Sequence, residues 1–152
     1  LEQPMSRTFD FGDDFGGKTE CLPASFADPV TDWFSTGIPN IASYVAVIDG
    51  FQTLETISSI AAIDDMPSGP PVEELHRKKA CVVAEARNAR GDMACARMLA
   101  PHGYLSTFIF AAGVAKKVLG GSVIPGYQTP SRVFGSRFLR EFEDAGVSIE
   151  HF

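Results

Sequence analysis

The chain has 152 residues and a net charge of −6, with 45% hydrophobic and 21% charged residues. This length suits one domain spanning residues 1–152, and the composition is that of a folded globular protein rather than a disordered one. The acidic balance argues against a nucleic-acid partner held through phosphate neutralisation, and no apolar run reaches the roughly 20 residues of a membrane span.

Acidic and basic residues are distributed unevenly along the chain. Residues 1–75 contain thirteen acids and two bases, whereas residues 76–152 contain six acids and eleven bases, so the halves carry −11 and +5. Such asymmetry can mark a basic ligand or partner site in the second half. The alternative is that the halves interleave in one small domain and their charges mix on one surface.

The first third of the chain is predicted to form a hairpin, a polar loop and a strand. Apolar alternation predicts a strand over residues 5–11, a turn over 12–17 and a returning strand over 18–22. Residues 23–40 are rich in Pro, Asp and Ser, and we expect an ordered loop with one helical turn there. The β-branched and aromatic run 41–48 predicts the next strand.

The middle of the chain is predicted to contain two helices and a second hairpin. Apolar residues at helical spacing predict a helix over 51–63, and residues 71–79 are expected to form a short polar helix. Alternating residues predict strands over 80–87 and 93–99, which a hairpin loop over 88–92 would join.

The last third is predicted to form two helices and a strand. Residues 104–119 have a helical pattern, and Thr129-Pro130 predicts the start of a helix to residue 145, in which Phe134, Phe138 and Phe142 recur every four residues. Residues 147–151 predict a final strand. Hairpins mixed with long helices predict an α+β fold, with a single, mostly antiparallel or mixed sheet, helices packed on it and no Rossmann domain.

The three cysteines give no disulfide framework. Cys21, Cys81 and Cys95 are odd in number and far apart in sequence, which favours a reducing, cytoplasmic compartment. Cys81 and Cys95 lie in apolar, alternating runs, so we expect them to be buried small hydrophobic residues.

The sequence contains no complete catalytic constellation, and we assign no catalytic residue. It lacks the glycine-rich dinucleotide motif and the P-loop, so no residue is assigned to a cofactor. His76, His102 and His151 are scattered and none has the spacing of a metal ligand, so no metal site is predicted either. His102 lies at a strand-to-helix turn, where binding residues are often found.

Two loops carry more polar variety than a turn needs. The loop before the strand at 41–48 and the loop before the helix at 130–145 are both stiffened by proline, and the second has free N–H groups and an arginine that can hold an anion or carboxylate. The alternative is structural, with side chains that only close turns or cap a helix. The six candidate substrate-binding residues are Ser35, Thr36, Asn40, Tyr127, Thr129 and Arg132. We predict that Ser35–Asn40 and Tyr127–Arg132 lie side by side.

These loops also belong to a series of motifs that resembles a known family. The most specific is Ser35-Thr-Gly-Ile-Pro-Asn-Ile-Ala-Ser-Tyr-Val-Ala46. It is similar to the STGIPNI-x-x-Y segment of bacterial saccharopine dehydrogenase-like NAD(P)-dependent oxidoreductases. Weaker matches occur in the same order as in that family. One precedes this motif, at Arg7-Thr-Phe-Asp-Phe-Gly12. The others come after it, at Gly103-Tyr104 with Thr107, Pro125-Gly-Tyr-Gln-Thr-Pro130 and Phe134-Gly135.

The resemblance implies a place in a larger enzyme. Family members join an N-terminal Rossmann domain, which binds the nicotinamide cofactor, to a second α+β domain that covers the active-site cleft and often mediates dimerisation. The chain resembles only the second part. It is therefore expected to be the C-terminal substrate-binding and dimerisation domain, inactive alone, with a homodimeric partner, a missing Rossmann domain and a small-molecule substrate. NAD or NADP is expected for the full-length protein and no cofactor in this chain.

A second interpretation belongs to another functional class. The same residues fit a stand-alone α+β ligand-binding or protein-interaction module without catalysis. The reading frame upstream of Leu1 distinguishes the two, since a strand followed by G-x-G-x-x-G supports the oxidoreductase and a start codon at Leu1 supports the module.

Overall fold

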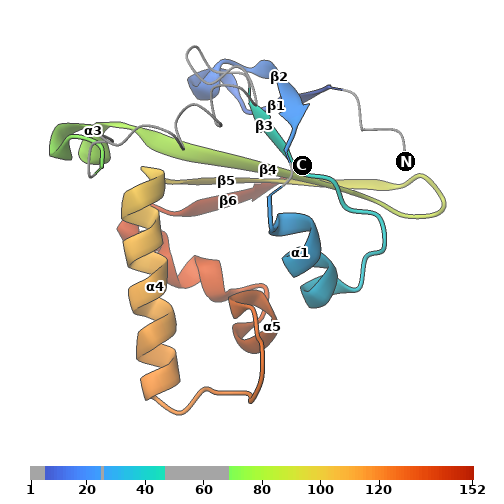
Figure 1. Ribbon diagram of the computed structural model, residues 1–152. Coiled ribbons are helices and arrows are strands. Elements are labelled where there is room, and N and C mark those ends of the chain that lie inside the picture. Colours follow the sequence, from blue (N-terminus) through green and yellow to red (C-terminus); the bar gives the residue numbers. More distant parts are fainter. Residues whose placement is uncertain (1–5, 25, 47–68) are drawn as a thin grey trace, which may run out of the picture.

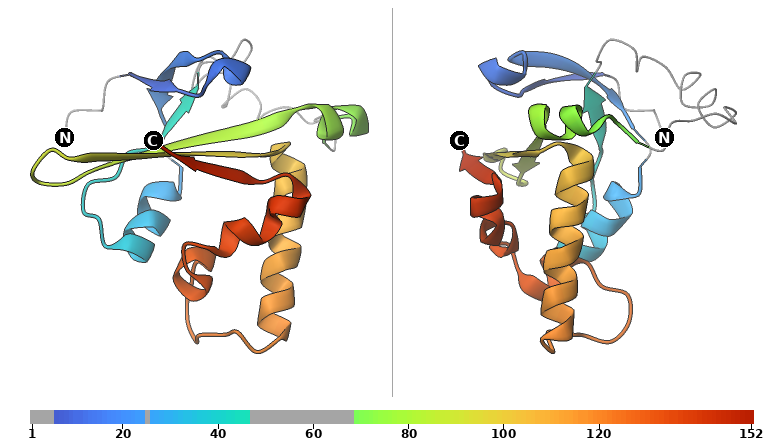
Figure 2. Two further views of the ribbon diagram at one scale, coloured as in Figure 1. Left: turned by 180° about the vertical axis from the view of Figure 1, so that it is seen from behind. Right: turned by 90° about the vertical axis from the view of Figure 1, so that its left-hand side faces the viewer.

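The fold consists of two sheets and a set of helices. The computed structural model describes residues 6–24, 26–46 and 69–152. Its strands form two antiparallel sheets of three strands each, sheet A in the order β1-β2-β3 and sheet B in the order β4-β5-β6. Sheet A lies over one face of sheet B, and helices α1, α4 and α5 lie on the opposite side of sheet B (Figures 1 and 2). The predicted α+β class is confirmed.

The expectation of a single sheet is wrong, because the two hairpins pair locally and then stack through side chains. Backbone pairing joins β1 to β2 and β2 to β3, and separately β4 to β5 and β5 to β6. Between the sheets, Arg7 Nη2 of β1 lies 2.8 Å from Glu85 Oε2 of β4. The thiol of Cys81 also donates to the Phe11 carbonyl across the same interface, at 3.8 Å.

Sheet A begins with the predicted hairpin. Strand β1 (Arg7–Asp10) pairs with β2 (Lys18–Pro23), and a short 3₁₀ turn, η1 (Asp13–Phe15), connects them. Gly12 precedes this turn with φ +82°, a conformation that favours glycine, and its N–H donates to the Asp10 carboxylate at 2.9 Å. Strand β3 (Tyr44–Ala46) falls inside the strand predicted over 41–48. The helix predicted over 51–63 lies outside the described residues.

The expected loop over 23–40 contains a real helix. Helix α1 (Asp28–Thr36) has proline in its first turn, where the ring preorganises the backbone, and Gly37 ends it with φ +71°. Its hydroxyl residues are compatible with a helix because their side chains donate hydrogen bonds to backbone carbonyls within α1. Ser35 donates to the Thr31 carbonyl at 2.7 Å. The pattern of Pro, Asp and Ser therefore marked the helix ends and not a loop.

Sheet B is built on the long predicted hairpin. Helix α3 (Val72–Arg77) leads into β4 (Lys79–Arg87), which pairs along its whole length with β5 (Met93–Pro101). Strand β6 (Ser148–His151) pairs with the other side of β5. These elements confirm the predicted helix, hairpin and final strand, and they make β5 the central strand of the sheet.

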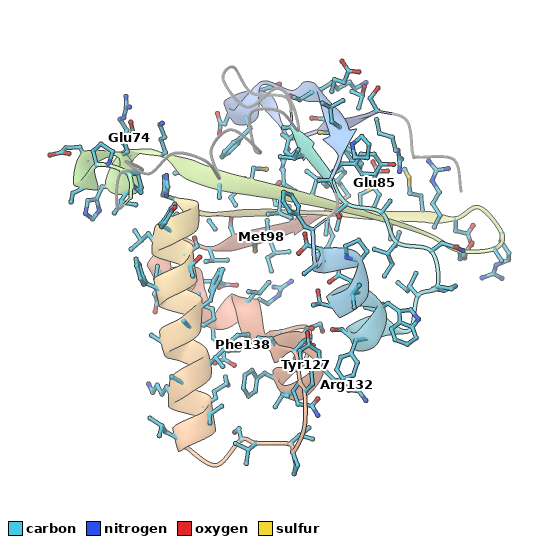
Figure 3. All side chains as sticks on the ribbon, in the orientation of Figure 1. Glu74, Glu85, Met98, Tyr127, Arg132 and Phe138 are labelled. Atoms are coloured by element: carbon cyan, nitrogen blue, oxygen red, sulfur yellow. The ribbon has the colours of Figure 1, made fainter. Side chains whose placement is uncertain are left out.

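The two faces of sheet B have different neighbours. Residues opposite each other in the register share a face, and successive residues alternate between faces. Glu85 faces sheet A, whereas Met98 faces the helices (Figure 3). Arg97 of β5 also faces sheet A, because a Cβ at Gly12 would run into its guanidinium group. Glu150 of β6 holds that guanidinium at 2.7 Å.

The helical side contains α4 and the C-terminal segment. Helix α4 (Gly103–Leu119) confirms the helix predicted over 104–119, and its N-cap is His102, whose Nδ1 accepts from the Tyr104 N–H at 3.2 Å. The candidate histidine at the strand-to-helix turn therefore holds the start of a helix. Helix α4 is 17 residues long, and no helix in the described ranges has both the length and the apolarity to cross a membrane.

The single helix predicted over 130–145 is wrong. Helix α5 (Pro130–Phe134) stops at Gly135, which has φ +81°, and the chain resumes as a 3₁₀ segment, η2 (Phe138–Ala145). The rings of Phe134, Phe138 and Phe142 still contact one another in sequence, with centroid separations of 4.9 and 5.1 Å. The four-residue spacing thus reflects a shared apolar face, although the backbone is not one α-helix.

The buried core is small. Its residues come from strand β2 of sheet A, from strand β5 of sheet B, and from η2 and the residue before β6. The buried hydrophobic residues in the described ranges are Cys21, Cys95, Ala100, Phe138 and Val147. Phe138 is 5% exposed and contacts Phe142, whose ring lies against Gly113 of α4. The absence of a side chain at Gly113 lets η2 approach α4 closely.

We predict that Gly113→Ala destabilises the protein. Alanine normally stabilises a helix interior by about 1 kcal/mol relative to glycine. Here the new Cβ would collide with the Phe142 ring, and overpacking of this kind typically costs about 1–3 kcal/mol. Urea denaturation measures the change. Gly113→Ala combined with Phe142→Leu should recover stability, and an unchanged or raised midpoint for Gly113→Ala alone would contradict the packing.

Candidate functional site

The two predicted loops meet in the structure. Ser35, at the end of α1, and Thr129, just before α5, bring their hydroxyl oxygens to 2.7 Å although 94 positions separate them in sequence. Arg132 Nη1 donates to the Phe34 carbonyl at 3.1 Å. Helices α1 and α5 lie side by side, with Tyr127 and Arg132 at their junction (Figure 3). The predicted juxtaposition of Ser35–Asn40 and Tyr127–Arg132 is confirmed at Ser35 and does not extend to Thr36 or Asn40.

The hydroxyl groups at this junction form an ordered chain. A hydroxyl has one proton, and that of Ser35 is directed to the Thr31 carbonyl at 2.7 Å. Thr129 must therefore donate to Ser35, and Ser131 Oγ lies 3.3 Å from Thr129 Oγ1. Thr129 occupies the N-cap position of α5, but its side chain accepts no hydrogen bond from the helix. The capping role considered for Thr129 is thus wrong, since its hydroxyl joins the two segments instead.

Aromatic rings surround the cation of the site. The Phe34 and Tyr127 rings meet edge to face with centroids 5.0 Å apart. The guanidinium carbon of Arg132 lies 4.4 Å from the Phe34 ring centroid, which is the geometry of a cation–π contact. Arg132 is exposed and forms no ion pair with a described carboxylate. Its remaining N–H groups can therefore bind an anion from solvent.

Thr36 and Asn40 do not join this junction. The Thr36 hydroxyl donates to the Asp32 carbonyl at 2.7 Å and accepts from the Ile38 N–H at 3.2 Å, so it closes the turn after α1. Asn40 is exposed, and its side chain has no hydrogen bond within the described ranges. Of the six predicted residues, the structure brings together Ser35, Tyr127, Thr129 and Arg132.

An apolar hollow lies on the other side of α1. Its volume is about 260 Å³, and it lies between α1 and the segment that follows the helix. Trp33 is 56% exposed at this hollow. The lining residues are Pro29, Val30, Trp33, Ile38, Pro39 and Ile41. Three of them belong to the 35–46 motif, so that motif contributes an apolar surface as well as Ser35.

Gln128 is a candidate that sequence reasoning missed. Its Nε2 donates to the Pro125 carbonyl at 3.2 Å, which fixes the orientation of the amide. The Oε1 atom is then buried without a hydrogen-bond partner in the described part of the chain. A buried acceptor of this kind is costly unless a donor reaches it. The only sequence signal was its position between Tyr127 and Thr129, because burial cannot be read from the motif.

The cysteines do not supply chemistry here. Burial is the main cause that raises the pKa of both Cys21 and Cys81, so each remains a protonated thiol near neutral pH. Cys95 is buried, as expected, whereas Cys81 is half-buried. In residues 6–24, 26–46 and 69–152, no three metal-ligating side chains gather in one place.

The junction brings together groups that can bind a ligand. It combines a guanidinium group, an unpartnered amide oxygen and two aromatic rings. No histidine or carboxylate hydrogen-bonds to the hydroxyls of Ser35, Thr129 or Ser131 among the described residues. A nucleophilic role would require such a base, and none of the described residues supplies one to these hydroxyls.

No protein-family model, curated protein or solved structure matches this chain. The resemblance to saccharopine dehydrogenase-like oxidoreductases thus rests on the quoted motifs alone.

Proposed function

We propose that this chain is the substrate-binding and dimerisation domain of a saccharopine dehydrogenase-like NAD(P)-dependent oxidoreductase. The observation that supports the proposal is that the most specific motif, 35–46, meets one of the weaker matches, 125–130, at Ser35 and Thr129. NAD or NADP, bound by a separate Rossmann domain, would supply the hydride chemistry. This chain would be inactive alone.

The substrate class that suits the site is a small molecule with a carboxylate group. Arginine matches a carboxylate because its planar group can donate two parallel hydrogen bonds. Arg132 has N–H groups available for this, and the Phe34 ring stacked on it keeps the guanidinium in place.

We predict that Arg132→Gln weakens carboxylate binding. Succinate serves as the probe, and backbone amide shifts measured by NMR at constant ionic strength report binding. A charge-assisted hydrogen bond contributes about 1.5–3 kcal/mol, so the dissociation constant should rise about tenfold or more. Arg132→Lys, which keeps the charge but not the planar pair of donors, should give an intermediate affinity.

Arg87→Gln is the matched control, since it removes the same charge from an exposed position at the end of β4. Its affinity for succinate should equal that of the unchanged protein. The proposal fails if Arg87→Gln and Arg132→Gln have equal effects, or if succinate leaves the amides of 34–40 and 127–132 unmoved.

The dimerisation role is supported by the outer face of α4. Tyr104, Phe108 and Leu119 are 56%, 66% and 87% exposed along this helix. If two copies of α4 cross antiparallel between Ala111 and Ala112, Tyr104 lies opposite Leu119, and Phe108 lies opposite the small Ala115. Large side chains then meet small ones. Lys116, the charged residue on this face, lies opposite Thr107. The face is therefore complementary to itself.

We predict that the chain self-associates through this face and that Phe108→Glu makes it monomeric. A buried carboxylate without a partner is costly, so the dimer should be lost. Sedimentation equilibrium measures the molecular mass. Val72→Glu, at a 64% exposed position of α3, is the control and should leave association unchanged. A monomer for the unchanged protein at millimolar concentration would contradict the proposal.

A second candidate function is a stand-alone ligand-binding or protein-interaction module without catalysis. The apolar hollow beside the half-exposed Trp33 favours it, because such surfaces bind partners in the absence of any cofactor. A reading frame upstream of Leu1 that encodes a strand followed by G-x-G-x-x-G supports the oxidoreductase instead.

A further inference from the structure

A second hollow lies on the helical side of sheet B, between η2 and β6. Its volume is about 500 Å³, within the range of ligand sites in proteins. It lies between the start of η2 and strand β6, which pack against each other. The lining residues are Ser136, Arg137, Arg140, Ile149 and His151. Two arginines and a histidine thus border one opening.

The backbone explains why these side chains converge. The Arg140 N–H donates to the Arg137 carbonyl at 3.0 Å, so the two arginines span one 3₁₀ turn. Residues three apart in such a turn eclipse each other, which directs both guanidinium groups to the same side. On β6, Ile149 and His151 lie two residues apart and share the face that looks toward η2.

In the part of the chain that the structure describes, no carboxylate lies within ion-pair distance of the arginines of this hollow. Neither Arg137 nor Arg140 forms an ion pair or a side-chain hydrogen bond with any described residue. Two of the neighbouring acids are engaged elsewhere, and the other two, Glu143 and Asp144 of η2, form no ion pair with either arginine in the described ranges. Glu141 pairs with Lys117 at 2.8 Å, and Glu150 points to the opposite face of sheet B, where it pairs with Arg97. Two like charges are therefore held together in a chain of net charge −6.

We propose that this hollow binds the phosphate group of a small phosphate monoester. A dianion matches two guanidinium groups in charge, and its tetrahedral oxygens can accept from several directions, whereas one arginine fork already satisfies a planar carboxylate. Arg137 and Arg140 donate to the phosphate oxygens, and the Ser136 hydroxyl and the His151 ring N–H are further donors. The space is larger than one phosphate needs, so the organic part of the ligand lies against Ile149.

The test is titration with inorganic phosphate and with glycerol 3-phosphate, monitored by backbone amide shifts at constant ionic strength. Both should perturb residues 135–140 and 148–151 in a saturable manner, and the monoester should bind more tightly because it also contacts Ile149. Acetate should bind at least about tenfold more weakly, since it lacks the second charge. Equal shifts with phosphate and acetate would overturn the proposal.

Double variants distinguish phosphate binding in this hollow from a general attraction of phosphate to positive charge on the surface. Arg137→Gln with Arg140→Gln should weaken phosphate binding by about tenfold or more, given the contribution of hydrogen bonds to charged groups. Arg90→Gln with Arg87→Gln removes the same charge from the β4–β5 hairpin and should leave the affinity unchanged. Arg137→Lys with Arg140→Lys keeps the charge if the glutamine variant fails to fold. Equal losses in the two glutamine variants would contradict the proposal, while Arg132→Gln tests the carboxylate site independently.

Discussion

The alternation of side chains along β5 is the constraint on which the rest of the structure depends. β5 is the central strand of sheet B, and its two faces meet different layers. Arg97 points to sheet A, where Glu150 fixes it beneath Gly12. Met98 and the buried Ala100 point to the helices. A shift of register by one residue would exchange these faces and bury a guanidinium group among the phenylalanines.

Both candidate sites follow from the helical face of this sheet. The buried Phe138 ring packs against Phe134 and Phe142, and the contact of Phe142 with Gly113 fixes η2 against α4. The chain must then turn sharply at Gly135, which separates α5 from η2. That turn places α5 against α1 and, on its other side, places Arg137 beside β6. One glycine thus separates the proposed carboxylate site from the basic hollow.

The local sequence pattern was sufficient to predict the elements that are stabilised by contacts between residues close in sequence. The hairpin of β4 and β5, helix α4 and strand β6 were predictable because alternation, helical spacing and terminal residues agree there. The helix over 130–145 was not, since the phenylalanine spacing is compatible with two short helices around Gly135. The buried oxygen of Gln128 and the convergence of Arg137 with His151 depend on tertiary contacts, which no single segment of the sequence encodes.

Segments far apart in the sequence form one surface where α1 meets residues 127–132. The most direct measurement is a nuclear Overhauser effect between the ring protons of Phe34 and Tyr127 in the isotopically labelled protein. The ring centroids are 5.0 Å apart in an edge-to-face contact, so strong cross-peaks are expected, together with upfield shifts of the edge protons. Cross-peaks from each ring only to its own segment would show that α1 and the 127–132 segment do not meet, and would contradict the account.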